Sequence, residues 1–179
     1  ARLSRERVRA ELLKLVSARR GAEVAEALEQ AGLLGRLVSC LGDAGRLARS
    51  SGCDRAGRLA AYLVRTGEDA ERLFEALRLS KAEHERLSGY AAVLARMMSR
   101  PASIDEAELR RCAVLHGLAA TGLALRATAG EPRPVPTEGA KRLLARFETG
   151  EQPLPRFPLT GAALVAAGLP PGPEIGRRL

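Results

Sequence analysis

The sequence predicts an all-α fold, an elongated array of about nine or ten helices with a small C-terminal helical hairpin lobe. Three observations predict it. Apolar residues recur at spacings of three and four along most of the 179 residues, and residues that cap helices precede these stretches. No stretch alternates apolar and polar residues as an exposed strand does.

The first two predicted helices lie near the N-terminus. The first covers residues 3–16, with Ser4 as its N-cap. Its apolar face carries Val8, Leu12, Leu15 and Val16. The second covers residues 22–31 and ends at Gly32, where glycine favours a left-handed turn. Its expected inward residues are Val24, Ala27, Leu28 and Ala31.

Three shorter helices are expected next. One lies within residues 36–50 and is interrupted by Gly42 and Gly45. Two more follow Asp54, with a turn at Thr66 and Gly67 between them. Their apolar faces are Ala56, Leu59, Ala60 and Leu63, then Leu73, Phe74 and Leu77.

A longer helix begins at Ser80, which forms a capping box with Glu83, and Pro101 ends it. Its apolar stripe consists of Leu87, Tyr90, Ala91, Leu94 and Met98. Ser103 and Glu106 predict a second capping box. In the helix that follows, one face carries Leu109, Cys112, Ala113 and His116. Gly117 and Gly122 weaken its continuation toward Ala129.

The C-terminal part begins with a proline-rich linker at residues 130–136. Thr137 is expected to cap the helix that follows. Its inward residues are Ala140, Leu143, Leu144 and Phe147. After an extended stretch at residues 150–158, Thr160 opens a short helix, Gly168 ends it, and Pro173 begins a second one. The result is a helical hairpin.

Charge is the strongest signal in the composition. The chain has 29 Lys and Arg against 21 Asp and Glu, a net charge of +8, and an isoelectric point near 10.4. This balance favours acidic partners, nucleic acid first. Only 3% of the residues are aromatic, so contacts with phosphates and RNA shape are favoured over base stacking.

The cysteines and the length of the apolar runs indicate in which cellular compartment the protein is expected. Cys40, Cys53 and Cys112 are too far apart for a metal motif, and no signal peptide precedes them. They are expected to be reduced, buried or half-buried thiols in a cytoplasmic protein. No apolar run reaches the length of a membrane span, so no membrane partner is expected.

Catalytic patterns are incomplete. His84 and Glu85 begin like a zinc-protease motif, but Ser88 stands where the second His is needed. His116 falls on an apolar face, which favours a core or boundary role. Nucleotidyl transfer needs clustered carboxylates for Mg²⁺. The Asp residues, which are Asp43, Asp54, Asp69 and Asp105, are each isolated in sequence. No catalytic residue is therefore assigned.

Two patterns at the ends of the chain suggest a family. Residues 159–164 read LTGAAL and residues 168–179 read GLPPGPEIGRRL. This spacing resembles the C-terminal tail of bacterial CCA-adding tRNA nucleotidyltransferases, a family that also contains bacterial poly(A) polymerases. Ala163 stands where those tails usually carry Asp. Residues 4–12 resemble the last conserved motif of these enzymes, in the neck behind the nucleotide pocket.

Two weaker matches lie between these ends. Residues 29–34 resemble a turn that follows the neck helices of the family. Residues 77–83 resemble the cap of a long body helix, with Lys81 in place of Asn. The resemblance implies three domains: residues 1–35 as the end of the neck, 36–130 as the helical body, and 131–179 as the tail. The catalytic head would be absent.

The resemblance implies a function in RNA positioning. Body and tail would grip the backbone of the tRNA elbow so that the 3′ end reaches the head. Mg²⁺ with ATP and CTP would belong to that head, and no cofactor is expected in this chain, which would be inactive alone. The expected RNA-binding residues are Lys141, Arg142, Arg146, Gly172, Arg177 and Arg178. Support of the nucleotide pocket is expected from Arg5, Glu6 and Arg7. The partners would be tRNA and the N-terminal catalytic domain of the same protein.

Two alternatives remain open. The chain could be a free-standing basic helical module that binds nucleic acid or a protein, with a tail that works like a helix-hairpin-helix element on a duplex backbone. It could also be an interaction domain whose charge reflects a GC-rich genome. Arginine pairs at residues 19–20, 110–111 and 177–178 are individually typical of solvated surface. Collectively, a row of arginines along one wall would bind phosphates without reading sequence.

Overall fold

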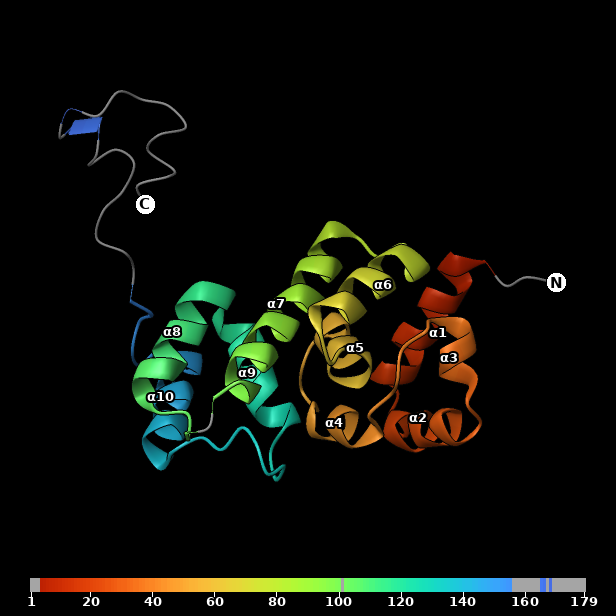
Figure 1. Cartoon of the computed structure of the whole chain (residues 1–179), viewed down its shortest axis with the longest axis horizontal. Helices are drawn as coiled ribbons and strands as arrows, with labels where there is room; N and C mark the ends of the chain where they lie inside the picture. Colours follow the sequence, from red (N-terminus) through yellow and green to blue (C-terminus); the bar gives the residue numbers. More distant parts are fainter. Residues whose placement is uncertain (1–3, 101, 156–164, 167, 169–179) are drawn as a thin grey trace.

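The computed structural model describes residues 4–100, 102–155, 165, 166 and 168 (Figure 1). These residues form ten α-helices and no β-sheet, which confirms the all-α prediction. The helices are α1 (Arg5–Ser17), α2 (Gly21–Gln30), α3 (Leu33–Leu37), α4 (Ala44–Arg49), α5 (Arg55–Leu63), α6 (Gly67–Leu77), α7 (Lys81–Met98), α8 (Glu106–His116), α9 (Leu118–Ala127) and α10 (Glu138–Glu148).

The helices follow one another along the long axis of the molecule. In Figure 1, α1, α2 and α3 lie at one end, and α8, α9 and α10 lie at the other. The longest helix, α7, lies between these ends and packs against α5, α6, α8 and α9. The two groups of predicted site residues on α1 and α10 therefore stand at opposite ends of the array.

Three predicted capping residues, Ser4, Ser80 and Thr137, start their helices as expected, and Asp54 and Thr66 are caps that were not predicted. The side chains of Ser4, Asp54, Thr66, Ser80 and Thr137 each accept a hydrogen bond from a backbone N–H in the first turn of the helix that follows. Ser80 and Glu83 form the predicted capping box. A cap satisfies donors that the helix itself leaves free, so local sequence is sufficient to place these boundaries.

One continuous apolar core joins the two ends, from Leu12 on α1 to Phe147 on α10. Tyr62 and Tyr90 are among its largest fully buried side chains. The Tyr62 hydroxyl donates to the Ala25 carbonyl at 3.0 Å, which ties α5 to α2. The predicted inward residues of α10, Ala140, Leu143, Leu144 and Phe147, are all buried. No described helix is both long and apolar enough to cross a membrane.

The predicted inward face of α2 is wrong. Val24 and Ala27 are exposed, whereas Gly21 and Ala25 are buried. A side chain at Gly21 would collide with the Leu15 carbonyl of α1, so the backbones approach closely here. Close approach requires the smallest residues of α2 to face inward, and this requirement overrides the apolar pattern.

Two further boundaries differ from the prediction. The single helix expected within residues 36–50 is two helices: α3 starts at Leu33, α4 starts after its cap Asp43, and Gly45 lies inside α4. The helix expected to continue from α8 toward Ala129 is broken at Gly117, whose φ of 88° no helix can accommodate. The chain turns there, and α9 packs back against α8.

Ser103 is not the cap of α8. Asp105 takes that role, and its Oδ1 accepts the Glu108 N–H at 2.8 Å. Residue Ile104 pairs instead with the proline-rich stretch: its N–H donates to the Val135 carbonyl, and its carbonyl accepts from the Thr137 N–H, both at 2.9 Å. The predicted linker is therefore held against the start of α8. The three-domain division remains a prediction.

The predicted tail hairpin falls almost entirely outside the described residues. Gly168 is described, and it has the positive φ, 94°, that was expected where the first tail helix ends. Its N–H donates to the Val165 carbonyl at 2.9 Å. Gly172, Arg177 and Arg178 lie outside the described residues.

Candidate nucleic-acid interface

The expected nucleotide-pocket residues lie in the first turn of α1. Arg5 Nη1 donates to the Glu75 carbonyl of α6 at 3.4 Å, and Glu6 forms a 2.7 Å ion pair with Arg78. Both partners of that pair are largely exposed. Arg5 and Glu6 therefore link α1 to α6 at the outer end of the array. Support of a nucleotide pocket by these residues remains a prediction.

Arg7 borders an apolar cavity of about 200 Å³ between α1 and the two helices that follow. Its walls are Arg7, Val8, Glu11, Leu12, Leu15, Leu28 and Leu37. Val24, Leu33, Leu37 and Leu41 nearby in sequence are also exposed. Exposed apolar surface of this kind is typical of a contact with another protein surface.

Three of the expected RNA-binding residues lie on the outer face of α10, as predicted. Lys141, Arg142 and Arg146 are all exposed. Lys141 pairs with Glu138 at 2.7 Å and Arg146 pairs with Glu151 at 3.0 Å, while Arg142 has no carboxylate partner among the described residues. Exposed pairs contribute only about 0–1 kcal/mol, so a phosphate can replace either carboxylate at little cost.

Other arginines are committed to the fold. Arg46 and Arg49 of α4 each donate to Glu131 at 2.7 Å, and Arg46 also lies 3.4 Å from Asp43. The side chain of Arg46 is only 11% exposed. We call these four residues the Glu131 cluster. Its two positive and two negative charges balance. The cluster therefore holds α4 against the segment that follows α9 in sequence.

Burial raises the pKa of Glu131, but the hydrogen bonds and positive charge of Arg46 and Arg49 outweigh it and hold that pKa below its usual value. The same competition lowers the pKa of Glu83, which accepts 2.7 Å hydrogen bonds from Arg9 of α1. Both carboxylates join elements that are distant in sequence. They are therefore structural anions and not free acids.

A different group of arginines surrounds Glu108 on α8. Its carboxylate is 2% exposed and accepts from Arg96 at 2.5 Å, Arg100 at 3.0 Å and Arg111 at 3.2 Å. We call these four residues the Glu108 cluster. Three positive charges here meet one negative charge. The cluster lies at the same end of the molecule as α10, which packs against α8.

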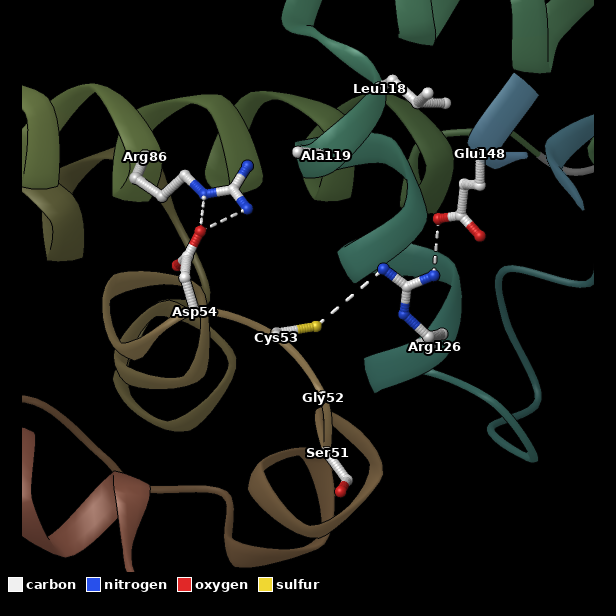
Figure 2. A pocket seen from close by; sticks show the side chains of 9 residues that line it. All are labelled: Ser51, Gly52, Cys53, Asp54, Arg86, Leu118, Ala119, Arg126 and Glu148. Atoms are coloured by element: carbon white, nitrogen blue, oxygen red, sulfur yellow. Dashed lines mark hydrogen bonds and ion pairs between the residues drawn. The ribbon is translucent and has the colours of Figure 1, made fainter. Parts of the chain in front are cut away.

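Figure 2 shows an open cleft of about 610 Å³ bordered by α7, α9 and the loop before α5. Arg86 donates twice to Asp54, at 2.9 and 2.7 Å, and Arg126 donates to Glu148 at 2.6 Å. The Cys53 thiol lies 3.9 Å from Arg126. Each guanidinium has its own carboxylate, so the two pairs add no net charge to the cleft.

The histidines and cysteines lie as the sequence indicated. His84 stacks on Phe74 with ring centroids 4.3 Å apart, and its Nε2 lies 2.9 Å from Glu71. Phe74 was expected on the apolar face of α6 with Leu73 and Leu77, but it is exposed, so that part of the prediction is wrong. His116 is half-buried. All three cysteines are free, with Cys40 and Cys112 buried and Cys53 half-buried. Burial raises the pKa of Cys40 to about 11, so this thiol is protonated at neutral pH.

Within the described ranges, no three His, Cys, Asp or Glu side chains are grouped so that they could hold a metal ion. Comparison with known proteins adds no assignment: no protein-family model matches the sequence, and no curated protein matches it. The family resemblance therefore rests on the motifs quoted above.

Sequence reasoning missed the Glu108 cluster. Two signals for it are present. Arg96 and Arg100 are four residues apart, and Arg111 follows Glu108 by three, which is the spacing of neighbours on a helix. Nothing local shows that the end of α7 meets the first turns of α8, because the chain reverses between them.

Proposed function

We propose that this chain is the tRNA-binding and positioning part of a CCA-adding tRNA nucleotidyltransferase or a poly(A) polymerase of the same family. Body and tail would grip the backbone of the tRNA elbow. The distance between the two ends of the helical array would set how far the 3′ end lies from the catalytic head. Catalysis, with Mg²⁺, ATP and CTP, would belong to that head.

The observation that carries this proposal is the exposed cationic face of α10. Arg142 is free of carboxylates among the described residues, and Lys141 and Arg146 have only weak surface pairs. A helix with its apolar side buried and three cations outward can follow a phosphate backbone without reading bases. Arg177 and Arg178 of the tail, which lie outside the described residues, would extend this surface if they lie beside it.

The apolar cavity at the other end also supports the proposal. A neck that continues into a catalytic head needs an apolar contact surface, and α1 with Arg7, Val8 and Leu12 offers one. The same cavity favours the second candidate, a free-standing helical module that binds a protein partner. Reading the gene upstream of Ala1 separates the two. A strand-rich segment with paired aspartates supports the first, and a start codon immediately before Ala1 contradicts it.

Binding is tested by titrating the chain with whole tRNA and with an acceptor-stem minihelix that lacks the elbow. Tighter binding of whole tRNA is expected, and equal affinities would contradict the elbow grip. The triple variant Lys141→Gln, Arg142→Gln and Arg146→Gln should lower the slope of log K against log salt by about 2 to 3, since each phosphate contact contributes close to one. Circular dichroism checks that α10 remains folded.

A further inference from the structure

The Glu108 cluster holds more positive charge than its carboxylate can balance. Arg96 donates through Nε to Oε1, while Arg100 and Arg111 donate through Nη1 to the same oxygen, Oε2. Two nitrogens within hydrogen-bonding distance of one oxygen cannot be much farther apart than about twice that distance. The guanidinium groups of Arg100 and Arg111 are therefore neighbours.

Arginine cannot relieve this repulsion by losing a proton, because its pKa lies far above neutral pH. Asp105, three residues before Glu108, caps α8 through the Glu108 N–H, and no described ion pair joins any other carboxylate to these arginines. Burial of Glu108 also weakens the screening by water. Two uncompensated positive charges remain, so the cluster gains from a further anion.

Terminal guanidinium nitrogens that can hold such an anion remain available on Arg100 and Arg111. Arg111 is 56% exposed and Arg100 is 36% exposed, and each uses only one of its two terminal nitrogens on Glu108. The Nε of Arg100 is buried with no hydrogen-bond partner among the described residues. The bound carboxylate fixes the guanidinium groups in place, which reduces the entropy that a ligand must overcome.

We propose that Arg100 and Arg111 form a phosphate-binding site held in place by Glu108, and that in this protein the site takes a backbone phosphate of RNA. A tetrahedral phosphate can accept from both guanidinium groups at once, while Arg96 holds the other oxygen of Glu108 and adds a third positive charge. The balanced pairs in the Figure 2 cleft lack this excess charge, which is why the phosphate is assigned to the Glu108 cluster.

The RNA part of this inference rests on the proposed function, and the site adds to it a second contact region beside α10. The two regions are close, because a side chain at Gly139 in the first turn of α10 would collide with the carboxylate of Glu106 in the first turn of α8. One RNA strand could therefore contact Arg142 and Arg111 in succession.

The test measures affinity for whole tRNA by fluorescence anisotropy over a series of salt concentrations, using the full chain. The variants are Arg100→Gln, Arg111→Gln and Arg111→Lys. The matched control is Arg72→Gln: Arg72 donates to Asp69 three residues before it at 3.1 Å, as Arg111 does to Glu108, but without excess positive charge, because Glu68 also lies 3.9 Å from Arg72. Circular dichroism and thermal unfolding confirm that each variant is folded.

We expect Arg100→Gln and Arg111→Gln each to weaken binding about tenfold at low salt and to lower the salt slope by about 1. Arg111→Lys should recover part of the affinity, and Arg72→Gln should change it less than about twofold. Affinities of the two cluster variants equal to that of Arg72→Gln would overturn the inference while leaving the proposed function intact.

A second measurement uses inorganic phosphate alone. Added phosphate should raise the melting temperature of the wild type more than that of an Arg100→Gln, Arg111→Gln double variant. If the wild type binds no tRNA, the proposed function and the RNA ligand fail together. The phosphate measurement then decides whether the site itself exists, because equal stabilisation of both proteins would exclude it.

Discussion

The Glu131 and Glu108 clusters are built from the same side chains and differ in charge balance. In the Glu131 cluster, two guanidinium groups meet two carboxylates, and the side chain of Arg46 is nearly buried. In the Glu108 cluster, three guanidinium groups meet one buried carboxylate, and the arginines reach the surface. A balanced set stabilises the fold. An unbalanced set keeps attraction for a ligand, so counting charges separates the two roles where composition cannot.

The largest effect is expected from Glu108→Gln. This change leaves three neighbouring guanidinium groups without a carboxylate, and it should lower the free energy of unfolding by about 3–5 kcal/mol. Urea denaturation measures the loss. Added phosphate should restore more stability to this variant than to the wild type. A loss below about 1 kcal/mol would show that Glu108 is not needed to hold the three arginines together. It would contradict the proposed difference between the two clusters.

The next largest effects are expected from single arginine substitutions, which should lower the free energy of unfolding more in the Glu131 cluster than in the Glu108 cluster. Arg46→Gln leaves Glu131 and Asp43 with one cation fewer in a nearly buried position, and a loss of about 2–3 kcal/mol is expected. Arg111→Gln leaves two cations for Glu108 and removes repulsion, so its cost should stay within about 0.5 kcal/mol. Urea denaturation of both variants decides this. Equal costs would mean that charge balance does not govern these sites.

Acid should weaken the balanced contacts. The folded state lowers the pKa of Glu131 and of Glu83 below their usual value of 4.5. A lowered pKa contributes stability that is fully present above that usual value and is lost as the pH falls through the folded-state pKa. The wild-type free energy of unfolding should therefore fall below about pH 4.5. Glu131→Gln should show a shallower decline, and parallel curves would contradict the assignment.

The smallest effect concerns the surface of α10. Glu138→Gln breaks the exposed pair with Lys141, which should leave the free energy of unfolding nearly unchanged. It also frees Lys141 and removes a negative charge near the expected phosphate path. Affinity for tRNA should rise about twofold, as measured by anisotropy at low salt. A fall in affinity would place the RNA elsewhere.

The sequence allowed prediction of those features that depend on neighbouring residues. Ser80 with Glu83, and Thr137 before the apolar face of α10, mark helix starts because a cap acts within one turn. The inward face of α2 could not be predicted, since it depends on how closely α1 approaches Gly21. Ser103 with Glu106 predicts a capping box from the local pattern, and that prediction is wrong: Asp105 is the cap, and Ile104 pairs with Val135, a contact that the local pattern does not show.

In the candidate site, too, some features could be predicted from neighbouring residues and others depend on long-range contacts. The outward positions of Lys141, Arg142 and Arg146 follow from helical periodicity alone. The Glu131 cluster joins residues 85 apart in sequence, and the Glu108 cluster joins the end of α7 to the start of α8. Which arginines remain available to a partner depends on these long-range pairs, and no count of basic residues reveals it.

The backbone pairing of Ile104 with Val135 and Thr137 closes a ring of chain that contains α8 and α9. The amide hydrogens of Ile104 and Thr137 should therefore exchange with deuterated solvent at a common, slow rate, as parts of one opening unit. A protease cut inside the proline-rich stretch on one side of the bridge would leave both fragments associated, held by the paired backbone and the shared core.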